Sequence, residues 1–248
     1  MRSRLTLTLV PLVLLAGVIA ACAPGSPPTS TVPASSTSTT STTTTTVGPR
    51  YVMDSGHIDA FEVTVVGNAL KVQIKDSTFI SSPSIVYRDP AATILRAKSG
   101  AGPTGSQTAV PNPAGQFAFL GAQGSAIWLL PQVQNPNLLW PGRSTERINS
   151  GVLQGNSLTW VVDSVSGPGS FHLYQTSAFG SPQVKFTSNS PWPQSSVEPV
   201  GAHAHFTWAF GSLGTYTLNF RATATLANGT TVTSGPVPYT VVVGNQPA

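Results

Sequence analysis

Short runs in which apolar and polar residues alternate recur along most of the chain. Residues 61–66 and 70–75 form two such runs around a Gly-Asn pair, and residues 216–224 and 230–233 form two more around an Asn-Gly pair. A period of two is typical of a half-buried strand, and a short connection of Gly and Asn is typical of a tight turn. The pattern therefore predicts two β-hairpins.

Further runs of the same kind predict more short strands. Turn signals such as Pro141-Gly142 separate them, and only residues 144–149 show a weak helical period. Short strands at this spacing are typical of a sandwich of two sheets. We predict an all-β fold, a single elaborated β-sandwich of the immunoglobulin-like kind over residues 51–248. The further expected strands are 93–97, 126–130, 158–162, 170–174, 183–186, 203–210 and 239–243.

The run from His203 to Phe210 has two faces of different character. Phe206, Trp208 and Phe210 alternate on one face, and the two residues His203 and His205 occupy the other. Residues i and i+2 of a strand share a face, so the aromatic side chains are expected to fix this strand to the core. The two imidazoles are then expected to stay free on the opposite side.

Three of the four histidines lie in two short pairs of potential ligands. One pair is His57 with Asp59, and the other is His203 with His205. Side chains at i and i+2 are about 6.5–7 Å apart along a strand, close enough to converge on one ion. Three imidazoles and a carboxylate would complete a four-coordinate metal site, unless Asp59 orients an imidazole from behind. The alternative is that these are ordinary surface or packed histidines.

The donor atoms decide which metal such a site would take. The single cysteine is Cys22, near the N-terminus, so a thiolate-rich site is excluded. Imidazole with carboxylate suits Zn²⁺ first, with Mn²⁺ and Cu²⁺ as alternatives. His172 is a candidate additional ligand, although its place between Phe171 and Leu173 also suits a solvent-facing or hydrogen-bonded imidazole.

The N-terminal residues predict export and lipid anchoring. Arg2 and Arg4 precede a long apolar run, which ends in Ile-Ala-Ala directly before Cys22. A branched apolar residue, two small residues and a cysteine resemble a bacterial lipobox. We predict a lipoprotein signal peptide at 1–21 and a lipidated Cys22 that anchors the chain to the extracytoplasmic face of the cell membrane. The alternative is a plain apolar helix with an incidental cysteine.

The segment that follows Cys22 is rich in Ser, Thr and Pro. Residues 23–50 contain ten Thr, six Ser and five Pro. Such a composition cannot bury a core, so 22–50 is predicted to be the lipidated cysteine followed by a disordered linker. The linker would hold the folded domain away from the membrane.

Composition and charge exclude several classes of function. Charged residues are 8% of the chain, against about 25% in a typical soluble protein, which argues against long surface helices and coiled coils. The formal net charge is +4 and Lys and Arg form no cluster, so nucleic acid is not expected as a partner. The sequence has no phosphate loop, dinucleotide fingerprint or Gly-x-Ser-x-Gly elbow. Because one cysteine cannot form a disulfide within the chain, the fold must depend on its core or on a bound ion.

The five tryptophans divide into two groups. Trp128, Trp160 and Trp208 lie in strand patterns and are expected in the core. Trp140 and Trp192 are flanked by proline, so we expect them in loops, where an exposed contact is easier.

Several segments together resemble the actinobacterial surface-anchored protein domain, the "choice-of-anchor M" family. They are 56–61, 119–132, 167–169, 201–210 and the terminal Val-Val-Val-Gly, and the likeness spans nearly all of 51–248. Its most specific part is His-Ala-His followed by Trp-Ala-Phe; Phe206 departs from the family pattern, which often has a small or polar residue there. Members tend to be encoded beside ABC transporters of the zinc/manganese type, so the resemblance implies an accessory role in metal acquisition.

These observations favour one function and leave two alternatives open. The favoured function is that of a lipid-anchored, extracytoplasmic surface protein, not an enzyme, that captures a metal ion or passes it to an ABC transporter or its binding protein. One alternative is a non-enzymatic adhesion or cell-wall-binding module with structural histidines. The other is a metal-dependent hydrolase of wall polymer, for which Glu198 and Asp163 are the candidate bases, although neither lies in a recognisable motif.

Overall fold

The structure is a computed structural model that describes residues 50–78 and 85–245. The predicted signal peptide at 1–21, Cys22 and the predicted linker as far as residue 49 lie outside the described residues. Within the described ranges, no helix has the length and apolar character needed to cross a membrane.

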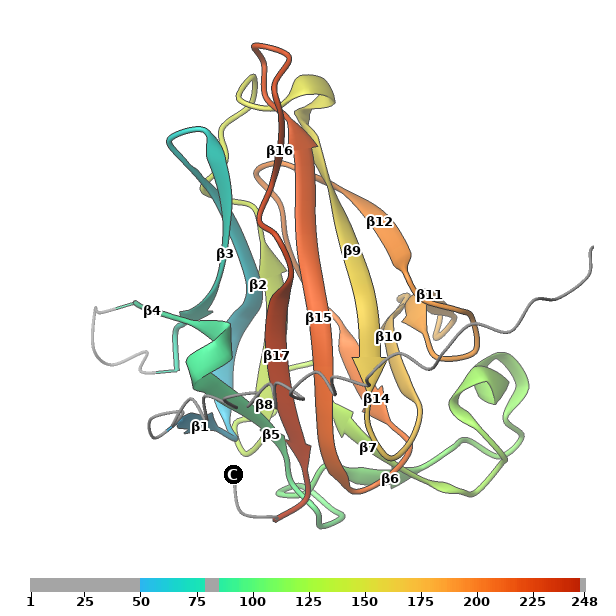
Figure 1. Cartoon of the computed structure of the whole chain (residues 1–248). Coiled ribbons are helices and arrows are strands. Elements are labelled where there is room, and N and C mark those ends of the chain that lie inside the picture. Colours follow the sequence, from blue (N-terminus) through green and yellow to red (C-terminus); the bar gives the residue numbers. More distant parts are fainter. Residues whose placement is uncertain (1–49, 79–84, 246–248) are drawn as a thin grey trace, which may run out of the picture. The chain divides into compact units, whose positions relative to one another are not determined.

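Three β-sheets make up the described part of the chain (Figure 1). In the first sheet β1, β5 and β17 are parallel neighbours, and the remaining pairs are antiparallel. The order of this sheet is β1 (Tyr51–Met53), β5 (Thr93–Ala97), β17 (Val237–Val243), β15 (Gly214–Thr225), β9 (Ser157–Ser166) and β12 (Gln194–Pro199), with β16 (Thr231–Thr233) beside β15.

The second and third sheets have five strands each. The second has the order β11 (Pro182–Thr187), β10 (Phe171–Thr176), β14 (Thr207–Phe210), β7 (Ala126–Leu130) and β6 (Gln107–Ala109). The third has the order β13 (His203–His205), β8 (Leu139–Ser144), β2 (Gly56–Val66), β3 (Ala69–Asp76) and β4 (Val86–Arg88). The helices in the described ranges are short 3₁₀ turns, η1 (Pro90–Ala92), η2 (Gly115–Leu120) and η3 (Gln154–Asn156).

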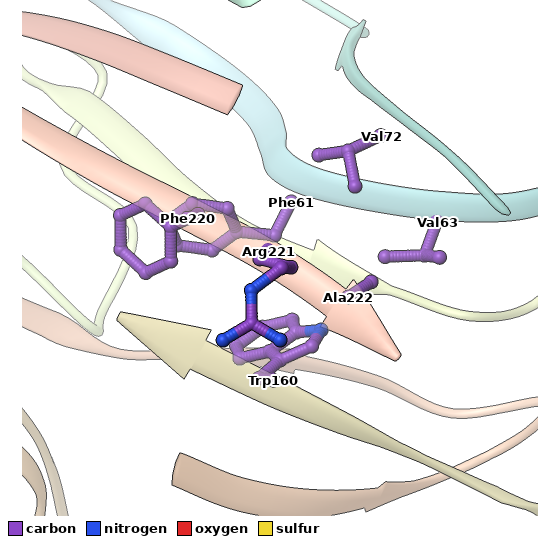
Figure 2. Close-up of a pocket in the computed structure, with 7 residues that line it drawn as sticks. All are labelled: Phe61, Val63, Val72, Trp160, Phe220, Arg221 and Ala222. Atoms are coloured by element: carbon purple, nitrogen blue, oxygen red, sulfur yellow. The ribbon is translucent and has the colours of Figure 1, made fainter. Parts of the chain in front are cut away.

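The inner faces of the three sheets share one hydrophobic core. The Phe61 ring of β2 stacks on Trp208 of β14 at 5.1 Å and lies 4.0 Å from the Phe220 ring of β15. Figure 2 shows the hollow beside Phe61, Trp160 and Phe220; its volume of about 10 Å³ is hardly room for one water molecule. The prediction of an all-β sandwich is therefore confirmed, and its immunoglobulin-like detail stays a prediction.

Both predicted hairpins are confirmed. β2 and β3 pair antiparallel as far as Val66 and Ala69, and β15 pairs with β16 as far as Thr225 and Thr231. The first turn needs a backbone φ of 58° at Gly67, a left-handed conformation that glycine adopts without a steric penalty. Trp128, Trp160 and Trp208 are buried, as expected, and Trp192 lies half-buried in a loop against the core.

The prediction of one continuous strand at 203–210 is wrong. β13 pairs with β8 in the third sheet, whereas β14 pairs with β10 and β7 in the second. The chain changes sheets at Phe206, whose ring is 1% exposed in the core. Strands that switch sheets form the corners of sandwiches, and a buried aromatic side chain holds this corner in place. The aromatic side chains still enter the core and the two histidines still lie apart from it, because His203 and His205 are both on the short β13.

The prediction of a turn at Pro141-Gly142 is also wrong. Both residues lie inside β8, which ends at Ser144 and gives way to turns. Proline is tolerated there because β13 ends opposite Gly142, so Pro141 has a strand neighbour on the β2 side only. As a consequence Trp140, expected in a loop, lies on a strand.

The sequence pattern also did not predict four further short strands, which are β1, β4, β6 and β12.

Candidate metal centre

Three neighbouring strands of the third sheet bring the four candidate ligands together. β2 carries His57 and Asp59, β13 carries His203 and His205, and β8 lies between them. Asp59 and His205 are both paired with Gly142 of β8, from opposite sides. The β2 ladder is irregular directly after Asp59, towards both of its neighbours. Such bulges change the direction of side chains next to them and are common beside functional sites.

The ligand atoms are close enough to share one ion. His57 Nε2 lies 3.1 Å from His205 Nε2, and His203 Nε2 lies 2.7 Å from Asp59 Oδ1. His57 Nε2 is 3.8 Å from the same Oδ1, and one ligand atom from each residue falls within 4.8 Å of the other three. Ligands of a tetrahedral zinc ion with bonds of about 2.0–2.1 Å are separated by about 3.3–3.4 Å. The observed distances bracket this value, so these four residues could hold a metal ion.

Gly142 provides the space at the base of this group. A Cβ atom at this position would lie 2.8 Å from His205 Cε1 and 3.0 Å from Asp59 Oδ1. Those contacts are shorter than normal van der Waals separations, so any larger residue would displace a ligand. Because Gly142 has no side chain, the ligands from β2 and β13 can converge over this position of β8.

Trp140 orients the imidazole of His205. The two rings stack at 3.8 Å with an interplanar angle of 13°, and the indole also lies 4.8 Å from the His57 ring. Trp140 Nε1 donates a hydrogen bond to the carbonyl of Gln132 at 2.7 Å, which fixes the indole. Supports of this kind hold metal ligands in place before an ion arrives.

The group combines a buried anion with accessible imidazoles. The Asp59 side chain is fully buried, whereas the side chains of His57 and His203 are 20% and 33% exposed. A buried carboxylate costs free energy unless positive charge compensates it. Lys75 Nζ supplies positive charge at Asp59 Oδ2, 3.0 Å away, and an ion could reach Asp59 Oδ1 from solvent past the two exposed imidazoles.

Two histidines of the group, His57 and His205, are biased towards the neutral form that binds metals. Burial lowers the pKa of His205 to about 4, and the neighbouring His57 and His203 contribute to the decrease. Burial also lowers the pKa of His57, although the charge of Asp59 opposes this. A neutral imidazole offers a lone pair to a cation, so protons compete little at neutral pH.

His172 lies in a different place, in the second sheet. Its side chain is fully buried, and Nδ1 lies 2.8 Å from Thr187 Oγ1. The ring of Phe119 packs against it at 5.5 Å, and burial lowers the pKa of His172 to about 4. The metal-ligand group consists of the other three histidines with Asp59, and His172 is outside it.

The two carboxylates considered as hydrolytic bases are engaged elsewhere. Glu198 Oε2 forms a buried ion pair with Arg143 at 2.7 Å. Asp163 Oδ1 forms a partly exposed ion pair with Arg221, also at 2.7 Å. Both therefore have structural partners.

Sequence reasoning missed Trp140, Gly142 and Lys75, whose Nζ lies 3.0 Å from Asp59 Oδ2. The i and i+2 spacing reveals partners on the same strand only; these three residues belong to neighbouring strands.

No protein-family model matches the chain, and no curated protein or solved structure does either. The resemblance to the choice-of-anchor M domain therefore stays a prediction.

Proposed function

We propose that this chain is a lipid-anchored surface protein that captures a divalent transition-metal ion outside the cell membrane, with Zn²⁺ the preferred ion and Mn²⁺ or Cu²⁺ the alternatives. The convergence of three imidazoles and one carboxylate from two strands is the observation that carries the proposal. The captured ion would pass to an ABC transporter or its binding protein.

The exposure of the group favours transport over a purely structural role for the ion. His57 and His203 are partly exposed, whereas the aromatic core is separate and fully formed without the group. An ion that reaches its ligands from solvent can also leave by the same path. Four protein ligands fill a tetrahedral shell and leave no position for an activated water, which favours a carrier over an enzyme.

Membrane attachment rests on the Ile-Ala-Ala-Cys segment that ends at Cys22. Replacement of the thiol should prevent acylation. We expect Cys22→Ser to release the protein from the membrane fraction or to leave the signal peptide uncleaved. A Cys22→Ser protein that still fractionates as a processed lipoprotein would contradict the anchor.

A non-enzymatic cell-wall or adhesion module is the second candidate. It is favoured by the 2.7 Å contact between His203 and Asp59, which is a satisfactory hydrogen bond without any ion. In that case the histidines would only connect β2 to β13.

Metal content separates the two candidates. The full chain, purified without a histidine tag, should contain close to one equivalent of metal by elemental analysis. Calorimetric titration of the metal-free protein with Zn²⁺, Mn²⁺ and Cu²⁺ should give one site, and the double variant His203→Ala/His205→Ala should bind none of them. Equal binding by both proteins would refute the metal function and favour the structural module.

A further inference from the structure

The two oxygens of the Asp59 carboxylate contact different side chains. Oδ1 is the oxygen near His203 and His57, whereas Oδ2 lies 3.0 Å from Lys75 Nζ. Asp59 Oδ2 is buried, and in the described residues no hydrogen bond of good geometry reaches it. Its partner is the ammonium group of Lys75. The two oxygens therefore have separate partners.

The sheet itself fixes Lys75 in this position. Lys75 is the direct cross-strand neighbour of Asp59 in the β2–β3 pair. Its side chain is 18% exposed, and Nζ also lies 3.3 Å from Glu146 Oε2. Burial alone would lower the pKa of Lys75, but the contacts with Asp59 and Glu146 raise it, so the ammonium stays charged.

We propose that Lys75 determines which metal the centre selects, by holding Asp59 Oδ2 and restricting this carboxylate to one coordinating oxygen. The inference depends on the proposed metal function. With Asp59 bound through Oδ1 alone, the protein supplies four ligands, the number that Zn²⁺ prefers. Hard ions such as Mn²⁺ and Ca²⁺ favour more oxygen ligands, including two from one carboxylate. Lys75 therefore discriminates against them.

Lys75 also acts through its charge, and this second effect must be separated from the first. An ammonium close to Asp59 repels every divalent cation to a similar degree. Its removal should strengthen the binding of Zn²⁺ and Mn²⁺ alike. Only the release of Oδ2 should change the ratio of the two affinities, because Mn²⁺ gains more from a second oxygen. The affinity ratio is thus the diagnostic quantity.

The test compares three variants of the full chain by titration with Zn²⁺ and Mn²⁺. In Lys75→Gln we expect the preference for Zn²⁺ over Mn²⁺ to fall by a factor of ten or more, whereas Lys75→Arg should retain most of it. Lys71→Gln is the matched control, because Lys71 is exposed on the same strand and its loss changes the net charge equally. An unchanged ratio in Lys75→Gln, with Zn²⁺ still bound by the wild type, would overturn the role of Lys75 and leave the metal function intact.

A measurement on the wild type guards against misfolding of the variant. X-ray absorption of the zinc-loaded protein should give four nearest ligands with a single carboxylate oxygen. A bidentate carboxylate, or five or more ligands, would overturn the inference. Failure of the wild type to bind any of the ions would refute the proposed function itself, and the inference with it.

Discussion

The His205 region and the His172 region are chemically similar and differ in their neighbours. Each imidazole lies on a strand against an aromatic ring, Trp140 or Phe119, and burial lowers the pKa of each to about 4. His205 faces other ligand atoms across Gly142, whereas the strand neighbours of His172 are Thr187 and the buried Ala209, neither of which is a metal ligand. A lowered pKa is thus common to both, and converging lone pairs distinguish the candidate metal centre.

The largest expected difference is in stabilisation by metal. An ion that binds only the folded protein stabilises that protein by about 2.7 kcal/mol when the free ion concentration is 100 times the dissociation constant. For a domain of this size, this corresponds to a rise in melting temperature of roughly 5–10 °C. His203→Ala and His205→Ala should each abolish this rise, without additive effects, because either change opens the same shell. Thermal unfolding with and without Zn²⁺ measures it.

The control for this experiment is His172→Ala. It should lower the melting temperature through loss of buried contacts but should leave the increase on addition of Zn²⁺ in place. If the zinc-dependent increase disappeared with His172→Ala and persisted with His205→Ala, the distinction between the two regions would be reversed.

The second expected effect is the acid sensitivity that His172 confers. In the unfolded chain an imidazole has a pKa near 6.5, whereas in the folded chain that of His172 is about 4. Between these values the unfolded state binds more protons, so the free energy of unfolding falls as pH decreases from 6.5 towards 4, by about 2 kcal/mol at pH 5. His172→Phe should remove this share of the decrease in urea unfolding at pH 7 and pH 5. An identical pH dependence in the variant would exclude His172 as the source.

A third, smaller effect is expected at Gly142. In Gly142→Ala the new methyl group would contact His205 and Asp59. An overpacking cost of about 1–3 kcal/mol corresponds to a loss of roughly 5- to 150-fold in metal affinity. Gly100→Ala is the matched control, because nothing lies within 4 Å of its Cβ position. Zinc titration should show a lower affinity for Gly142→Ala than for Gly100→Ala. Equal affinities of the two variants would mean that the ligands do not depend on the space at Gly142.

The sequence was sufficient to predict the two ligand pairs but not the residues on neighbouring strands that surround them. His57 with Asp59, and His203 with His205, follow from the two-residue period of strands. Residues on neighbouring strands depend on register, and the irregularity after Asp59 shifts that register in a way that composition does not reveal.

The fold shows the same division. Both hairpins could be predicted because local turn residues specify them. β8 could not, because Pro141 and Gly142 indicate a turn when read alone. The strand depends on the pairing with β2, and proline is accommodated because β13 ends opposite Gly142. The change of sheet at Phe206 was hidden for a similar reason: Phe206 at the corner and Trp208 and Phe210 after it all enter one core, as they would on a continuous strand.

The stacking of Trp140 on His205 also gives the protein an optical property. Trp128, Trp160 and Trp208 are buried in the core, whereas the indole of Trp140 lies 3.8 Å from a candidate ligand ring. Indole fluorescence is quenched by an open-shell ion such as Cu²⁺ at short range, while closed-shell Zn²⁺ leaves the emission intact. The chain thus contains an intrinsic fluorophore beside its ligands, and its emission would distinguish a bound open-shell ion from Zn²⁺ without any added label.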